Sequence, residues 1–114
     1  IKPIMQERHS NKEVYFNEQA YTNKKYVIPY VEKHLTVNKN IRVLEIGCGE
    51  AGNLKPFVDL GCSCMGVDLN KEKVEYGKTL YEQHPNKHLI QLVVEDIYNM
   101  TETFREEFDL IILR

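Results

Sequence analysis

The most informative feature of this 114-residue chain is a buried-strand pattern that runs directly into a glycine-rich turn, at residues 43–52 (Val-Leu-Glu-Ile-Gly-Cys-Gly-Glu-Ala-Gly). Glycine suits such a turn because the backbone bends tightly and a side chain would block an approaching ligand. Glu45 lies near the carboxyl end of the strand, where a carboxylate is costly to bury without a partner. A pyrophosphate would be repelled by this carboxylate, whereas a ligand with an ammonium group would supply the missing positive charge. The pattern therefore favours an ammonium-bearing ligand.

A second acid with a defined spacing is Asp68, which ends the next apolar segment, 21 residues after Gly47. A carboxylate about 20 residues beyond a glycine turn typically accepts hydrogen bonds from ribose hydroxyls. The alternative is that Asp68 caps the following helix, but Asn70 already suits that position. In open α/β sheets ligands bind outside the carboxyl ends of the strands, where the strand order reverses. We therefore expect Gly47 and Asp68 to lie at one ligand site.

Four segments in this order and spacing resemble the class I S-adenosylmethionine-dependent methyltransferases: Leu44-Glu45-Ile46-Gly47-Cys48-Gly49, Gly66-Val67-Asp68, Val94-Glu95-Asp96-Ile97 and Phe108-Asp109-Leu110-Ile111-Ile112-Leu113. The resemblance runs from about Ile41 to the last residue. One departure concerns the third glycine of the first motif, which usually falls where Ala51 stands here, with Gly52 following. Alanine is small enough to leave the turn intact.

The resemblance implies that S-adenosylmethionine is the cofactor and S-adenosylhomocysteine the product. Glu45 would face the amino group of the ligand, directly or through water. The helix after the turn would point its free amides at the ligand carboxylate, which makes Asn53 and Leu54 candidate neighbours. The turn itself would be formed by Gly47, Cys48 and Gly49, with Cys48 contributing only its backbone.

The same resemblance assigns the adenosine half of the ligand. Asp68 would bind the ribose hydroxyls and Leu69 would pack on the adenine face. Asp96 would accept a hydrogen bond from the adenine amino group, and the Ile97 amide would donate to a ring nitrogen. An aromatic side chain from the leading helix can close over the methionine end in related enzymes, and Tyr21 is the candidate here.

No catalytic base is assigned, because methyl transfer from a sulfonium is an in-line displacement that depends largely on alignment. A base matters only where the acceptor must lose a proton. We expect an unidentified, small-molecule acceptor, since the motifs read most like those of bacterial quinone- and small-molecule-methylating enzymes.

Strands alternate with helices from Ile41 onward, which predicts an α/β fold, a doubly wound Rossmann-like three-layer sandwich with a parallel sheet. Residues 41–114 would form the S-adenosylmethionine-binding half-domain, which ends after its fourth strand. The expected strands are 41–46, 63–68, 89–94 and 108–113, and the expected helices 54–60, 70–84 and 101–107. The resemblance implies the sheet order three, two, one, four.

Residues 1–40 are expected to form a helical segment that acts as a lid or cap. A short helix is expected at 11–20. A second helix follows from apolar and aromatic residues at helical spacing, with Thr22 as its cap and Pro29 at a kink or a start. The residues of this stripe are Tyr26, Val27, Tyr30, Val31, His34 and Leu35.

Composition excludes several classes of protein. A net charge of −2 gives no electrostatic footprint for nucleic acid. No apolar run approaches the ~20 residues of a membrane span, and no signal peptide is visible. Three cysteines argue against a disulfide framework and for a cytoplasmic protein, and Cys62-x-Cys64 is a poor zinc signature, so no metal site is expected.

Two other readings stay open. Gly47-x-Gly49-x-x-Gly52 also matches the fingerprint of NAD(P)-dependent oxidoreductases, although Glu45 and the Glu95-Asp96 pair argue against it. The chain could also be a non-catalytic cofactor-binding fragment, inactive by itself. In that case the fourth strand would lie at a sheet edge, and we expect self-association through Phe108 to Leu113.

Overall fold

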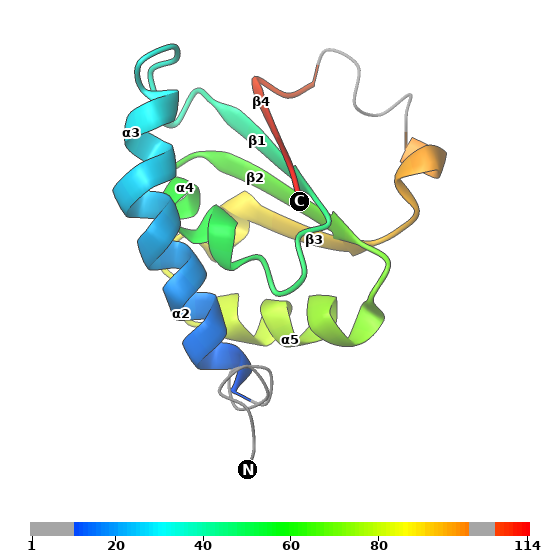
Figure 1. Ribbon diagram of the computed structural model, residues 1–114. Helices are drawn as coiled ribbons and strands as arrows, with labels where there is room; N and C mark the ends of the chain where they lie inside the picture. The colour runs from blue at the N-terminus through cyan, green and yellow to red at the C-terminus, as the bar shows by residue number, and fades with distance from the viewer. Residues whose placement is uncertain (1–10, 101–106) are drawn as a thin grey trace.

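A computed structural model describes residues 11–100 and 107–114, and its centre is a parallel four-stranded sheet (Figure 1). The strands are β1 (Arg42–Ile46), β2 (Ser63–Asp68), β3 (Ile90–Val94) and β4 (Leu110–Leu113). Their order is β3-β2-β1-β4, with every neighbouring pair parallel. The expected α/β fold and the expected strand order are confirmed.

The helical elements are α2 (Lys12–Thr22), the π-helix η1 (Asn23–Val27), α3 (Ile28–Val31), the 3₁₀ turn η2 (Gly52–Leu54), α4 (Lys55–Asp59), α5 (Lys71–Tyr81) and the 3₁₀ turns η3 (Lys87–Leu89) and η4 (Ile97–Met100). The Asn70 side chain accepts a hydrogen bond from the Lys73 N–H at 3.0 Å, so the expected cap of α5 is confirmed. The helix expected at 101–107 falls almost wholly outside the described residues.

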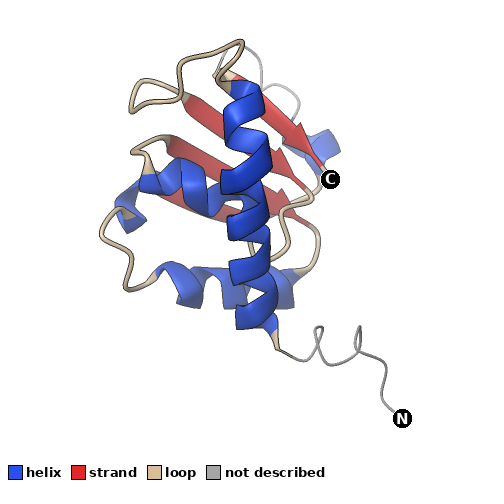
Figure 2. Cartoon of the chain, turned by 60° about the vertical axis from the view of Figure 1, so that its left-hand side comes forward, coloured by secondary structure: helices blue, strands red, loops and turns tan. Residues whose placement is uncertain are grey.

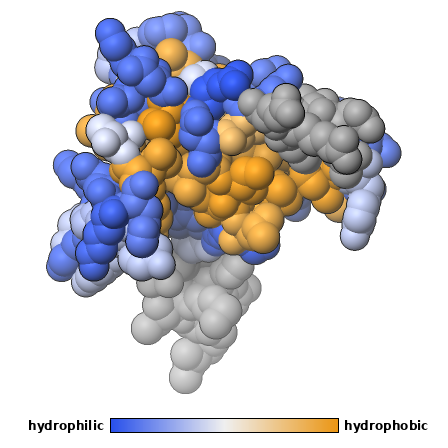
Figure 3. All heavy atoms as spheres, turned by 90° about the horizontal axis from the view of Figure 1, so that it is seen from above, coloured by the Kyte–Doolittle hydropathy of each residue, from blue (hydrophilic) through white to orange (hydrophobic). Residues whose placement is uncertain are grey.

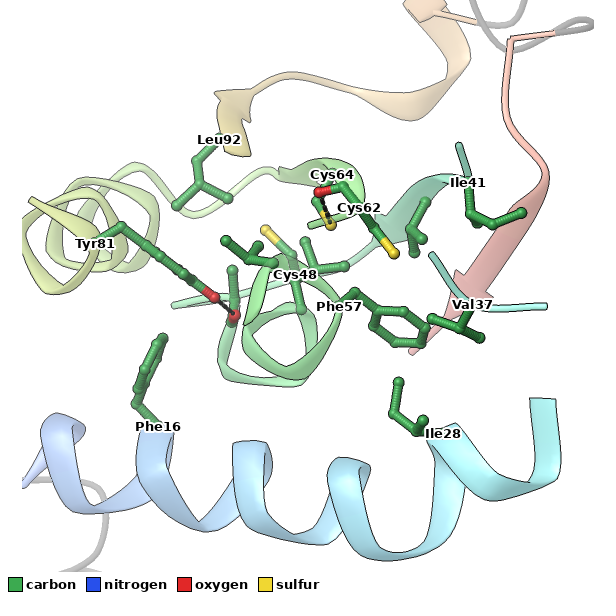
Figure 4. Packing of buried hydrophobic residues seen from close by; sticks show 14 of the residues in the cluster. Phe16, Ile28, Val37, Ile41, Cys48, Phe57, Cys62, Cys64, Tyr81 and Leu92 are labelled. Carbon is green, nitrogen blue, oxygen red and sulfur yellow. Dashed lines mark hydrogen bonds between the residues drawn. The ribbon is translucent and has the colours of Figure 1, made fainter. Parts of the chain in front are cut away.

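Helices α2, α4 and α5 lie on the same side of the sheet (Figure 2), and one buried hydrophobic cluster joins them to it. Along each strand alternate side chains point to this side, among them Val43, Cys64 and Leu92. Phe16 of α2 packs edge-on against Tyr81 of α5, with ring centroids 5.4 Å apart. Figure 4 shows both rings, with Ile28 and Phe57, around the same core.

The leading segment differs from the two helices expected. It is helical without interruption from Lys12 to Val31, and its cap is Asn11, whose side chain accepts from the Val14 N–H at 3.1 Å. Thr22 has helical backbone angles and makes no capping hydrogen bond, so the expectation of a cap there was wrong. Its residues Phe16 and Ile28 belong to the same core cluster as the strands.

The expected apolar stripe on this segment was also partly wrong. Tyr26, Tyr30 and His34 are exposed, whereas Ile28 is buried and Val31 packs partly against the core. The π-helix explains the difference, because the Ile28 N–H bonds to the Asn23 oxygen five residues back. One extra residue in the turn shifts the inward positions one place along the sequence.

β4 forms one edge of the described sheet, with Ile111 and Leu113 exposed by 47% and 75%. The space-filling view from above shows hydrophobic residues gathered in one area of the surface (Figure 3).

In the described part of the chain, no helix is long and apolar enough to cross a membrane.

Candidate functional site

The glycine turn after β1 has the backbone its sequence predicts. Gly47 and Gly49 have φ of 78° and 56°, a left-handed region that favours glycine. Ala51 adopts φ 69° and is fully buried, and its oxygen accepts a hydrogen bond from the Tyr81 hydroxyl at 2.7 Å. Alanine therefore fills the usual glycine position with the turn intact.

Gly52 permits a close approach between the turn and α2. A Cβ on Gly52 would lie 2.6 Å from the Phe16 backbone oxygen and 2.8 Å from the side-chain amide of Gln19. No side chain fits at those distances, so glycine at this position places α2 directly against the turn.

Glu45 is the buried acid at the centre of the site. Its side chain is fully buried, and Oε2 accepts a hydrogen bond from Asn53 Nδ2 at 2.9 Å. Oε1 is buried and has no partner among the described residues. Burial raises the pKa of Glu45 to about 7, while the Asn53 hydrogen bond and the charge of Arg114 act in the opposite direction. A cationic donor aimed at Oε1 would satisfy this carboxylate.

Asp68 connects the turn to the start of α5. Its Oδ2 accepts from the Gly49 N–H and its Oδ1 from the Asn70 N–H, both at 2.8 Å. A carboxylate has about four lone-pair sites, so each oxygen can still accept a hydroxyl. These two amides fix the direction in which the carboxylate points.

A cleft of about 280 Å³ opens beside Asp68, at the carboxyl ends of β1, β2 and β3. Its walls are Ile46, Gly47, Val67, Asp68, Leu69, Glu95, Asp96, Ile97 and Tyr98. Asp96 Oδ1 accepts from the Tyr98 N–H at 2.9 Å, which leaves Oδ2 for a ligand. The Ile97 amide begins η4, where a helical turn supplies no acceptor for it. The cleft thus offers a paired donor and acceptor near an exposed Leu69 side chain.

Residues 44–114 match the family described as "Methyltransferase domain", which is more than half of the chain. The chain belongs to this methyltransferase family. The resemblance drawn from the sequence motifs is confirmed.

Two curated methyltransferases are similar in sequence. The ubiquinone biosynthesis O-methyltransferase of Pelagibacter ubique is 32% identical over 74 residues, 65% of this chain and 29% of that protein. The tRNA (guanine(37)-N(1))-methyltransferase of Paramecium tetraurelia is 38% identical over 64 residues, 55% of this chain and 15% of that protein. The chain therefore spans less than a third of the length of these relatives.

Among solved structures, PKMT2 from Rickettsia typhi, in complex with AdoHcy, superposes with a TM-score of 0.59 at 30% identity. The match covers 66% of this chain and 14% of that one. About two thirds of the chain thus shares its fold with this methyltransferase structure.

The structure brings most of the expected site residues to one place. Gly47, Asp68, Leu69, Asp96 and Ile97 line the cleft. Glu45 and Asn53 are hydrogen-bonded to each other behind the turn. Gly49 bonds to Asp68. These assignments remain predictions about a ligand, but their geometry is that of one continuous site.

Three further expected site residues, Cys48, Leu54 and Tyr21, also do not line the cleft. The Cys48 side chain is fully buried and its N–H donates to the Val67 oxygen. Leu54 is fully buried and its N–H donates to the Ala51 oxygen. Both therefore hold the turn together. Tyr21 is 64% exposed, with the Lys25 ammonium 5.6 Å from its ring centroid, and it does not line the cleft.

Three residues that the sequence reasoning missed meet at the turn. Arg114 follows β4, and its guanidinium donates to the Tyr15 hydroxyl of α2 at 3.1 Å. With its amide oriented to satisfy both partners, Gln19 also accepts from this guanidinium. Tyr15 and Gln19 are four residues apart on one face of α2, so the helix period could have paired them, but no local signal links them to Arg114.

Proposed function

We propose that the protein is an S-adenosylmethionine-dependent methyltransferase and that the site around Glu45 and the cleft binds its cofactor. The single observation that carries the proposal is the buried Glu45 Oε1, which lies beside the glycine turn and has no partner among the described residues. A cationic donor would satisfy a buried carboxylate oxygen of this kind, and the amino group of S-adenosylmethionine is one. When bound, this cofactor supplies a methyl group on a sulfonium.

In this proposal each of the remaining residues binds a different part of the cofactor. Asp68 binds the ribose hydroxyls with the lone pairs that its two amide partners leave. Leu69 covers the adenine face, Asp96 accepts from the adenine amino group, and the Ile97 amide donates to the ring. The AdoHcy complex of the similar PKMT2 structure supports the choice of cofactor.

Titration calorimetry with S-adenosylhomocysteine tests the proposal, with NAD in a parallel experiment. We expect S-adenosylhomocysteine to bind and NAD to give no binding heat, because the Glu45 carboxylate would repel a pyrophosphate. Glu45→Gln should weaken S-adenosylhomocysteine binding by about tenfold to a hundredfold, the usual worth of a charge-assisted hydrogen bond. Glu50→Gln is the matched control, since Glu50 is a buried acid in the same turn that does not line the cleft. Binding of NAD alone would refute the proposal.

We further propose a small-molecule acceptor, in keeping with the similarity to the Pelagibacter ubiquinone biosynthesis enzyme. The Paramecium relative acts on tRNA, so transfer assays should offer a phenolic small molecule and tRNA side by side. The net charge of −2 favours the small molecule, because it provides little attraction for a phosphate backbone. Methylation of the tRNA alone would contradict this assignment.

A cytoplasmic location and self-association through β4 complete the proposal. The three cysteines are free and buried, as expected of a protein kept in a reducing compartment. The described sheet ends at β4, whose outer edge is open for pairing with a second strand.

A further inference from the structure

Arg114 lies beside the glycine turn on the same side of the sheet as Glu45. The β1–β4 register pairs Glu45 with Ile112 and Ile46 with Leu113, and the Arg114 N–H donates to the Ile46 oxygen at 3.1 Å. Alternation along the strand then places the Arg114 side chain on the face of Ile112, which packs against the helix-side core. A Cβ on Gly47 would be 3.6 Å from the Arg114 Cβ, so the two residues are immediate neighbours.

The guanidinium of Arg114 is held in place from α2. One Nη atom donates to the Tyr15 hydroxyl at 3.1 Å and to the Gln19 side-chain oxygen at 2.8 Å, and the other Nη atom also donates to Gln19. These contacts use three of the five N–H donors that a guanidinium carries. Neither partner is charged, so the positive charge of Arg114 is oriented but not neutralised by α2.

The backbone of the turn is poorly placed to bind an anion. Gly47 and Cys48 both donate to the Val67 oxygen, and the Gly49 N–H donates to Asp68. The Ala51 and Leu54 amides also donate within the turn. Five of the amides that a phosphate- or carboxylate-binding loop would direct at its ligand are thus already used by the protein. The negative end of a zwitterionic ligand needs another donor.

We propose that Arg114 binds the carboxylate of the ligand's amino-acid group, while Glu45 binds its ammonium. Tyr15 and Gln19 are positioning residues that act through Arg114. This inference rests on the proposed function and adds the residue that selects an intact amino-acid end. The opposite charges of Glu45 and Arg114, both beside the glycine turn, match the two charges of an α-amino acid.

The experiment compares ligands with and without the carboxylate on the full chain. The ligands are S-adenosylhomocysteine, its decarboxylated analogue and 5′-methylthioadenosine, which lacks the whole amino-acid end. The proteins are the wild type, Arg114→Met, Tyr15→Phe and Lys73→Met. Lys73 is the matched control, because its Cδ would lie 3.9 Å from a Cβ on Gly49, so it is a cation close to the same turn.

We expect Arg114→Met to weaken S-adenosylhomocysteine binding by about tenfold to a hundredfold and to leave binding of the two carboxylate-free ligands unchanged. Tyr15→Phe should cause a smaller loss with the same ligand pattern, and Arg114→Lys should restore part of the affinity. Lys73→Met should bind all three ligands as the wild type does.

Two results would overturn the inference and leave the proposed function intact. One is equal S-adenosylhomocysteine affinity in Arg114→Met and the wild type. The other is an equal loss for all three ligands, which would mean that Arg114 only ties α2 to the sheet. Failure of the wild type to bind any of the three ligands would instead overturn the proposed function, and the inference with it.

Discussion

Among single residues, Glu45 determines the chemistry of the site. Burying its carboxylate also lowers the stability of the ligand-free protein. Its carboxyl group is buried with one oxygen hydrogen-bonded to Asn53 and the other without a partner among the described residues. Burial raises its pKa from 4.5 to about 7, so below that pH the folded protein holds Glu45 mainly in the protonated form. The charged form required to bind an ammonium is therefore disfavoured until the ligand arrives.

This raised pKa predicts how stability changes with pH. Between pH 4.5 and about 7 the folded protein holds a proton on Glu45 that the unfolded chain has lost, so the Glu45 contribution to stability falls as pH rises through this range. Glu45→Gln should remove that dependence and raise the free energy of unfolding at pH 8 by on the order of 2 kcal/mol. Urea denaturation of both proteins at pH 5 and pH 8 measures this. An identical pH dependence in the two proteins would contradict it.

The sequence predicted Glu45, Asp68 and Asp96 as site residues because each lies at or just beyond the carboxyl end of an apolar strand, a local signal that places it at that edge of the sheet. It did not identify Arg114 and Tyr15, whose contact joins positions 99 residues apart. It also chose Tyr21 as the aromatic residue near the ligand, whereas Tyr15 is the tyrosine of α2 that contacts Arg114. The hydroxyl of either tyrosine could have served, and only the packing of α2 distinguishes them.

Among the secondary-structure elements, the leading helix shows how a single π-turn changes which of its residues face the core. A regular helix that buries Phe16, Gln19 and Asn23 would continue inward through Tyr26 and Tyr30. The π-turn before Pro29 inserts one residue, and Ile28 and Val31 face the core instead. Proline lacks an N–H and crowds the carbonyl four residues back, which a wider turn accommodates. Periodicity alone contains no signal for this shift.

The contact between α2 and the turn predicts the effect of a single methyl group. Gly52→Ala would place a Cβ 2.6 Å from the Phe16 oxygen, so α2 must move away and stability should fall by about 1–3 kcal/mol. Hydrogen exchange should quicken in α2. Gly49→Ala is the control, since its Cβ meets no atom closer than 3.9 Å and the cost comes from the left-handed backbone alone. Equal exchange in α2 for the two variants would refute the account.

At the scale of the whole molecule, the strand order brings residues from three distant segments to one cleft. The parallel order β3-β2-β1-β4 is the one that the resemblance to the methyltransferase family implies, whereas the alternation of strands and helices predicts only that the sheet is parallel. Strand positions agreed closely because apolar runs mark them well. The fourth strand begins two residues later than expected, at Leu110, where Asp109 instead accepts from the Arg42 N–H.

The open edge of the sheet predicts self-association. β4 exposes Ile111 and Leu113, and on its outer side it pairs with no strand among the described residues. Sedimentation velocity should show a species larger than the monomer whose share grows with concentration, and Ile111→Lys should abolish it. Leu60→Lys, which adds the same charge at a similarly exposed apolar residue away from the sheet, should have no effect. A monomeric wild type at high concentration would exclude this interface.

Proton release on binding S-adenosylhomocysteine tests the central claim most directly. At pH 6 the pKa of about 7 leaves Glu45 mostly protonated, and pairing with the ligand ammonium requires that proton to leave. Calorimetry at pH 6 in two buffers of different ionisation enthalpy should report the release of most of one proton per ligand bound by the wild type. Glu45→Gln should release almost none. Binding without proton release by the wild type would show that Glu45 does not receive the ammonium group and would contradict the account.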